Sequence, residues 1–91
     1  MLSFLPKNKN EIKEDLKQRL IKRRKSLKIT QKELSDRSDV SFGSIKRFES
    51  SGEISFSSLL KVALVLECLE DFEKVCVSED NRFESIEEVL K

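Results

Sequence analysis

The segment spanning residues 30–49 constrains the fold of this chain more than any other part of it. Thr30 can accept a hydrogen bond from a free amide in the first turn of a helix, and Glu33 can reach back to the N–H of Thr30. The segment 38–40 then interrupts the helix with residues that accept turn conformations, and Ser41 can begin a second helix. The segment therefore predicts a helix-turn-helix, two short helices joined by a tight turn.

The second helix of this motif is expected to have an apolar and a polar face. Ile45 and Phe48 follow at a spacing of three and would pack with Leu34 and Val40, which fixes the angle between the helices. The opposite face suits the major groove of DNA, because its side chains are short, polar or cationic, apart from one aromatic ring. We expect Arg47 to bind guanine O6 and N7, whereas the ring either contacts a thymine methyl group or belongs to the core. The residues predicted to read bases are Phe42, Gly43, Ser44, Lys46 and Arg47.

A second group of residues is predicted to hold the DNA backbone, which sets the register of binding without reading the sequence. Gln31 would bind a phosphate together with the amides of its helical turn. Serine hydroxyls and loop amides would bind others, and lysines would add long-range attraction. Because one module of this size buries only about 600 to 1,000 Å² on DNA, we expect a homodimer on an inverted-repeat operator in double-stranded DNA. The predicted phosphate-binding residues are Lys25, Lys28, Gln31, Lys32, Ser41, Ser50 and Ser51.

Several residue types that catalytic and metal sites need are missing from the chain. It contains no histidine, which removes the usual general base and the commonest metal ligand. Cys68 and Cys76 alone cannot complete a zinc site, and we expect both to be reduced residues packed on or near the core. With two glycines in all, no phosphate-binding Gly-rich loop is visible. We therefore expect no enzyme, no metal and no cofactor.

The charge is divided unevenly between the two halves of the chain. Residues 1–50 contain 14 Lys or Arg and 7 Asp or Glu, a net charge of +7, whereas residues 51–91 contain 4 and 10, a net charge of −6. The basic half contains the helix-turn-helix and fits contact with phosphates. The acidic half is a solvated face, a surface that orients the domain by repulsion, or a site for a basic protein partner.

The length of 91 residues leaves room for one small domain. We expect a flexible N-terminal arm at residues 1–10, a helix-turn-helix DNA-binding domain at 11–75 and a C-terminal extension at 76–91. Within the domain, the segment 50–54 is expected to be a loop in which Gly52 adopts positive φ. No run approaches the 18 or so apolar residues of a membrane span and no leader-like segment opens the chain, so we expect a cytoplasmic protein without membrane contact.

Three further helices are predicted outside the motif. Residues 10–26 repeat apolar side chains on one face, residues 56–66 follow Ser55 as a cap, and residues 68–74 form a short fifth helix. Residues 75–77 could form a short β segment. The side chains expected to point inward are Ile12, Leu16, Leu20 and Ile21 in the first helix, and Phe56, Leu59, Leu60, Ala63, Leu64 and Leu66 in the fourth. The outer face of the first helix is expected to carry Lys13, Lys17, Lys22, Arg23 and Lys25.

From Leu20 to about Leu66, the chain resembles the lambda-repressor-like (Cro/C1, XRE) family. The resemblance rests on three segments, Arg-Arg-Lys-Ser-Leu-Lys-Ile-Thr-Gln-Lys-Glu-Leu, Ser-Ile-Lys-Arg-Phe-Glu and Leu-Leu-Lys-Val-Ala-Leu-Val-Leu. It implies an all-α, five-helix DNA-binding domain, here with a short C-terminal extension. It also implies that Arg24 pairs with Glu49 and ties the first helix to the third, through a guanidinium that meets a carboxylate bidentately. Arg24 is otherwise a surface cation.

Within that family, the chain is most similar to HipB-type antitoxins, which repress their own operon and bind a HipA-type kinase toxin. The similarity runs from Gly43 to Glu73 and includes the Ser-Ile-Glu-Glu-Val-Leu tail. The apolar stripe of that tail, Ile86, Val89 and Leu90, is too short to stand alone in water, so it packs on its own domain, a second subunit or another protein. The alternatives are a standalone XRE-type repressor and a helix-turn-helix that serves as a protein-interaction module.

Overall fold

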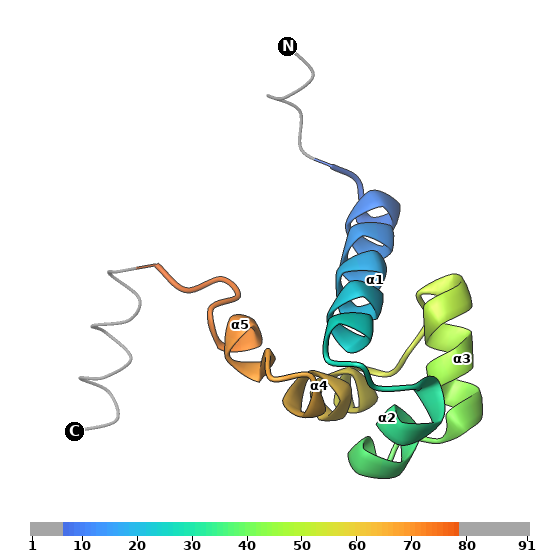
Figure 1. Cartoon of the computed structure of the whole chain (residues 1–91). Helices are drawn as coiled ribbons and strands as arrows, with labels where there is room; N and C mark the ends of the chain where they lie inside the picture. The colour runs from blue at the N-terminus through green and yellow to red at the C-terminus, as the bar shows by residue number, and fades with distance from the viewer. Residues whose placement is uncertain (1–6, 79–91) are drawn as a thin grey trace, which may run out of the picture.

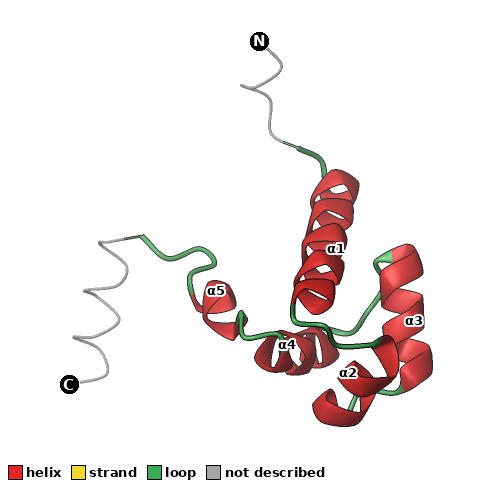
Figure 2. Cartoon of the chain, viewed as in Figure 1, coloured by secondary structure: helices red, strands yellow, loops and turns green. Residues whose placement is uncertain are grey.

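The computed structural model describes residues 7–78, and within that range the chain forms five α-helices and no strand (Figures 1 and 2). In the view of Figure 1, α1 and α3 stand side by side, α2 and α4 lie beneath them, and α5 follows α4. The all-α, five-helix fold expected from the sequence is confirmed. The helices are α1 (Lys9–Ser26), α2 (Gln31–Ser38), α3 (Phe42–Ser51), α4 (Phe56–Val65) and α5 (Leu69–Glu73).

The first four helices each begin at a polar cap, because the free amides of a first turn need acceptors. Thr30 Oγ1 accepts a hydrogen bond from the Glu33 amide at 3.0 Å, and the Glu33 carboxylate accepts one from the Thr30 amide at 3.1 Å. These two bonds form the predicted capping box. A second capping box lies at the start of α1, where Asn8 accepts from the amide of Glu11 at 2.8 Å. Helix α1 therefore begins two residues earlier than a cap at Asn10 would have placed it, because Glu11 is three residues beyond Asn8.

Two residues with positive φ end the helices of the motif. Asp39 has a φ of 61° at the C-terminus of α2, and Gly52 has a φ of 82° at the C-terminus of α3. The positive φ of Gly52 was predicted. The loop, however, does not start at Ser50 as expected. Ser50 and Ser51 form the last turn of α3, and the Gly52 amide closes it on the carbonyl of Phe48 at 2.7 Å.

The core lies where α2 packs against α3 and α4 and where α1 packs against α3. Its buried apolar residues are Leu20, Ile29, Leu34, Val40, Ile45, Phe48, Val62, Ala63 and Leu66. On α4, the prediction that Phe56 and Leu64 point inward is wrong, because these side chains are 70% and 63% exposed. Val62, which was not among the expected core residues, is buried instead. Seven of the ten residues of α4 are apolar and they occur on all of its sides, so periodicity alone could not tell which side meets α2.

Two cations expected on the outer face of α1 instead satisfy the ends of other helices. Lys17 is only 7% exposed, and its Nζ lies 3.5 Å from the carbonyl of Ser50 and 3.0 Å from the Glu14 carboxylate. Arg23 donates to the carbonyl of Leu66 at 2.8 Å, just beyond α4. The last carbonyls of a helix lack partners within it and carry partial negative charge, so nearby cations stabilise them.

The chain after α5 forms a turn rather than the β segment predicted for residues 75–77. Cys76 lies in that turn with a φ of 62°, and within residues 7–78 no strand is present for such a segment to pair with. Cys68 packs against the core, and burial raises the pKa of its thiol. Cys76 is exposed, contrary to the expectation that both cysteines lie near the core. The helix considered for residues 82–91 and most of the expected arm, residues 1–6, lie outside the described residues.

Candidate nucleic-acid interface

Helix α3 divides into a buried and an exposed face. Ile45 and Phe48 are 0% and 4% exposed and anchor the helix in the core. All five residues predicted to read bases lie on its exposed part: Phe42, Gly43, Ser44, Lys46 and Arg47. The arrangement gives α3 one surface for the domain and another for a partner, as a helix that enters a DNA groove requires.

Phe42 stands at the start of α3 with a lysine from each helix of the motif beside it. The Nζ of Lys46 lies 5.2 Å from the centre of the ring, and that of Lys32, on α2, lies 5.9 Å from it. Both distances fall within the range of a cation–π contact. The ring is 40% exposed, so it does not belong to the core. Phe42 therefore holds two cations at the junction of α2 and α3.

The implied partnership of Arg24 with Glu49 takes the form of a buried network beneath this surface. Arg24 Nε and Nη2 donate to the two Glu49 carboxylate oxygens at 2.7 and 2.9 Å, and Arg24 Nη1 donates to the carbonyl of Ile29 at 2.8 Å. Gln31 Nε2 also donates to Glu49, at 2.8 Å. The network joins α1, the α1–α2 loop, α2 and α3, so it fixes α3 against the rest of the domain.

The contact between Gln31 and Glu49 was not expected. Local sequence patterns do not predict it, because the two residues are 18 positions apart. Burial alone would raise the pKa of Glu49, but the hydrogen bonds from Arg24 and Gln31 outweigh it, so the pKa lies below its ordinary value. An amide nitrogen carries two hydrogens. Gln31 Nε2 therefore has a second N–H beyond the one that Glu49 accepts.

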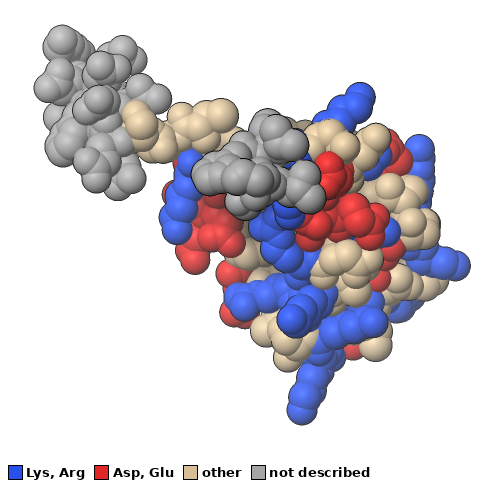
Figure 3. All heavy atoms as spheres, turned by 90° about the horizontal axis from the view of Figure 1, so that it is seen from above, with Lys and Arg blue, Asp and Glu red and all other residues tan. Residues whose placement is uncertain are grey.

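Several of the predicted phosphate-binding side chains lie around a shallow hollow of about 370 Å³ beside this network. Lys25, Gln31 and Ser50 line it, together with Lys46 of the base-reading group. Lys25, Lys28 and Lys32 are all exposed. Seen from above in Figure 3, Lys and Arg side chains dominate the lower part of the molecule, whereas Asp and Glu side chains gather mainly above and to the left. The hollow therefore combines cationic side chains and hydrogen-bond donors, the groups that bind phosphate, with one carboxylate, that of Glu49, which is paired with Arg24.

The hydroxyl groups of three predicted phosphate contacts are already engaged within the domain. Ser41 Oγ caps α3 by accepting from the Ser44 amide at 3.1 Å, and it donates to Ser44 Oγ at 2.8 Å. Ser50 and Ser51 each donate their hydroxyl hydrogen to the carbonyl of Arg47, at 3.1 and 2.7 Å. A hydroxyl has a single donor, so these groups would have to rotate before they could donate to a phosphate.

Gly43 is open to its surroundings. A Cβ built at this position has no heavy atom within 4 Å, apart from its own chain neighbours and the local helix backbone. Its φ is not positive, so neither the backbone conformation nor the packing of this domain requires glycine here.

Residues 7–78 contain neither a metal-binding cluster nor a membrane-spanning helix. No group of three or more Cys, Asp or Glu side chains in that range is placed to hold a metal ion. No helix there is both long and apolar enough to cross a membrane.

A family model described as helix-turn-helix matches residues 20–72, more than half of the chain. The match begins in α1, includes α2, α3 and α4, and ends in α5. No curated protein and no solved structure matches the chain. With the exposed, partly cationic face of α3 beside α2, this match identifies the chain as a member of the helix-turn-helix family of the lambda-repressor-like (XRE) type, a DNA-binding transcription regulator.

Proposed function

We propose that the chain is a sequence-specific repressor that binds an inverted-repeat operator as a homodimer, with α3 in the major groove. The observation that carries this proposal is the exposed face of α3, where Ser44, Lys46 and Arg47 are free of the core while Ile45 and Phe48 anchor the helix. Arg47 would read a guanine, and Phe42 would contact a thymine methyl group while its two lysines approach the backbone.

The phosphate contacts of the proposal centre on the hollow beside the Arg24–Glu49 pair. The second N–H of Gln31 would bind one phosphate oxygen, with Lys25 and Lys46 close by. Lys28 and Lys32 would add attraction from either side. Because Gln31 is held by Glu49, its position on the backbone would be coupled to the orientation of α3. The hydroxyls of Ser41, Ser50 and Ser51 contribute in this scheme only after rotation.

A binding assay with matched arginine variants tests these roles. Fluorescence anisotropy would compare the upstream DNA of the chain's own operon with mismatched sites, for Arg47→Ala and for Arg37→Ala as control. Arg37 lies exposed on α2, outside the proposed interface. We expect Arg47→Ala to remove about 1 to 3 kcal/mol of discrimination at one base pair and Arg37→Ala to remove none. Equal losses on matched and mismatched sites for Arg47→Ala would contradict the base-reading role.

The regulator would also act as the antitoxin of a HipBA-like system, repressing its own operon and binding a kinase toxin. This part rests on the similarity to HipB-type antitoxins and on the acidic half of the chain, residues 51–91. The exposed apolar side chains of Phe56 and Leu64 on α4 add a surface that a protein partner could cover. Co-expression with the neighbouring open reading frame, followed by affinity purification, tests it. Recovery of the chain alone, with its DNA binding intact, would favour a standalone repressor.

A further inference from the structure

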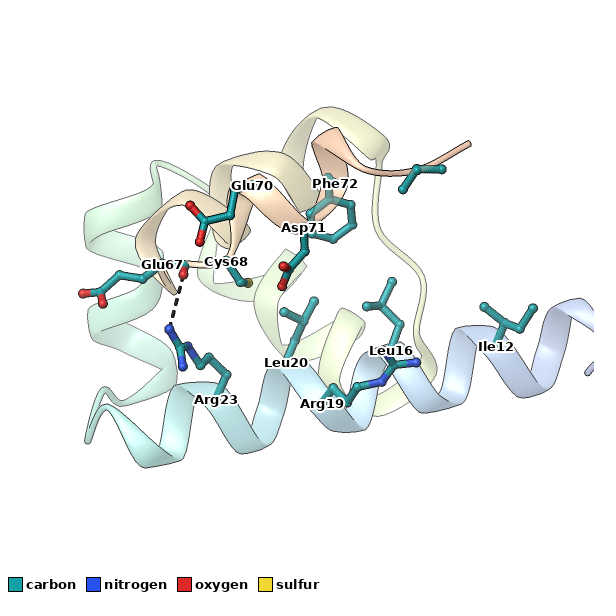
Figure 4. Close-up of a pocket in the computed structure, with 11 residues that line it drawn as sticks. Ile12, Leu16, Arg19, Leu20, Arg23, Glu67, Cys68, Glu70, Asp71 and Phe72 are labelled. Carbon is teal, nitrogen blue, oxygen red and sulfur yellow. Dashed lines mark hydrogen bonds between the residues drawn. The ribbon is translucent and has the colours of Figure 1, made fainter. Parts of the chain in front are cut away.

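A groove of about 530 Å³ lies between α1 and α5, and none of the predicted DNA-binding residues lines it. Figure 4 shows Leu16 and Leu20 of α1 on one side and Phe72 of α5 on the other. Ile12 and Val75 extend the apolar lining and are 52% and 63% exposed. Arg19, Arg23, Glu67, Glu70 and Asp71 also line it. We refer to this feature as the α1–α5 groove.

We propose that the α1–α5 groove is the docking site for the C-terminal segment of the same chain, residues 79–91. The described part of the chain ends at Ser78, three residues after Val75, so the segment starts beside the groove. Its sequence places Phe83, Ile86 and Leu90 at the spacing of one helical face, i, i+3 and i+7. So short an amphipathic helix is not stable alone in water and needs a surface to pack on.

The dimensions of the segment and of the groove agree. Along α1 the groove extends from Ile12 to Arg23, about 16 Å at 1.5 Å per helical residue. A helical stripe from Phe83 to Leu90 would be about 10 Å long and fits within that length. Residues 74–76 form a turn, so the free connection runs from Ser78 to Phe83, five residues that span about 17 Å when extended, which is close to the length of the groove. The segment can therefore reach any part of the groove of its own domain.

Position along the chain favours this segment over the N-terminal one, which also carries apolar residues. Residues 79–91 contain five acidic and two basic residues, a net charge of −3. The lining of the groove contains two basic side chains, Arg19 and Arg23, and three acidic ones, Glu67, Glu70 and Asp71, so charge does not select the occupant. In the N-terminal segment, the Nζ of Lys7 pairs with the carboxylate of Asp15, which does not line the groove, whereas Val75, close to the start of residues 79–91, does line it.

The short connection favours the chain's own segment over that of a second copy. A tether of this length gives an effective concentration in the millimolar range, well above usual protein concentrations. The docked segment would cover Ile12 and Val75 and leave the exposed face of α3 free. The inference is independent of the proposed repressor function, because its test involves no DNA.

A tryptophan reporter tests the proposal, since the chain contains no Trp or Tyr. In Phe83→Trp, we expect a blue-shifted emission and weak quenching by acrylamide. Adding Ile12→Asp or Val75→Asp should move both signals toward those of the urea-unfolded chain. The matched controls are Phe56→Asp and Leu64→Asp, which replace exposed apolar residues of α4 outside the groove and should leave both signals unchanged. Circular dichroism would verify that all four variants remain helical.

Three results with the reporter would overturn the proposal. The first is a reporter that is solvent-exposed in the folded chain, and the second is an equal response to groove and control variants. The third is a signal that strengthens with protein concentration, which would identify a second copy as the occupant. Thermal unfolding tests the same proposal without the reporter. The Tm of a chain that ends at Ser78 should be about 5 °C or more below that of the full chain. An unchanged Tm would show that the groove is unoccupied.

Discussion

Neutralising Glu49 should destabilise the domain strongly, because it leaves the Arg24 guanidinium buried without its counterion. The two side chains are only 10% and 9% exposed, and two hydrogen bonds of 2.7 and 2.9 Å join them. Breaking a buried pair by removing one partner costs about 3 to 5 kcal/mol. Glu49→Gln keeps one acceptor oxygen, so we expect a loss of about 3 kcal/mol at pH 7.

That loss is large for so small a domain. At about 0.05 to 0.15 kcal/mol per residue, the 72 described residues would have a total stability of about 4 to 11 kcal/mol. With about 4 to 8 °C per kcal/mol for a domain of this size, Tm should fall by about 12 to 24 °C. Urea and thermal unfolding followed by far-UV circular dichroism would measure both, since the chain lacks Trp and Tyr.

The pH dependence gives the same prediction an independent test. The folded-state pKa of Glu49 lies below its ordinary value of 4.5, so the stabilisation is complete above pH 4.5 and is lost as the pH falls through the lower, folded pKa. The Glu49→Gln variant lacks this carboxylate, so it has no such stabilisation to lose as the pH falls. Other carboxylates with lowered pKa values, such as those of Glu33 and Glu53, titrate in both proteins. Their effects therefore cancel from the difference in stability between the two proteins. The stability gap between the two proteins should therefore narrow below pH 4.5.

The control is an exposed ion pair on α2. Lys32 Nζ lies 3.5 Å from the Asp36 carboxylate, and the side chains are 67% and 64% exposed. Exposed pairs contribute about 0 to 1 kcal/mol, so Asp36→Asn should change the stability by about 0.5 kcal/mol or less. If Glu49→Gln lost no more stability than Asp36→Asn, or if the gap stayed constant down to pH 3, the assigned role of the buried pair would be wrong.

Other substitutions separate stability from DNA binding. Gly43→Ala should raise the free energy of unfolding by about 0.5 to 1 kcal/mol, because its Cβ meets open space within a helix. The same variant should weaken operator binding if the DNA backbone approaches Gly43 closely. Stronger operator binding would contradict that close approach. Gln31→Ala should weaken binding to all sites alike in anisotropy and lose about 1 kcal/mol of stability in urea with its bond to Glu49, and a change in base preference would contradict its phosphate role. Phe48→Ala should cost about 3 to 5 kcal/mol by chemical unfolding, because the ring is 4% exposed in the core, and a cost under 1 kcal/mol would contradict that packing. Operator affinity should fall steeply from 50 to 200 mM salt as counterions are released, so a flat response would exclude phosphate contacts as its main source.

Local sequence patterns were sufficient to predict the helix-turn-helix and the polarity of α3. A capping box depends on two residues three positions apart, and Thr30 and Glu33 form it as expected. Ile45 and Phe48 are buried as their spacing requires, and the residues between them are exposed. These features depend on backbone geometry within one or two turns of helix, which a linear sequence encodes directly.

Packing between distant segments determined the remaining features. Residues 62–65 of α4 are all apolar, and only contact with α2 and α5 selects Val62 over Leu64 for burial. Lys17 leaves the expected solvent face of α1 because the last turn of α3 presents it with a free carbonyl. Gln31 donates to Glu49 for a similar reason, since a buried carboxylate is stabilised by hydrogen-bond donors. The sequence determined which helices form and which face of α3 is free, while the tertiary structure decided which polar groups became partners, because those partners lie far apart along the chain.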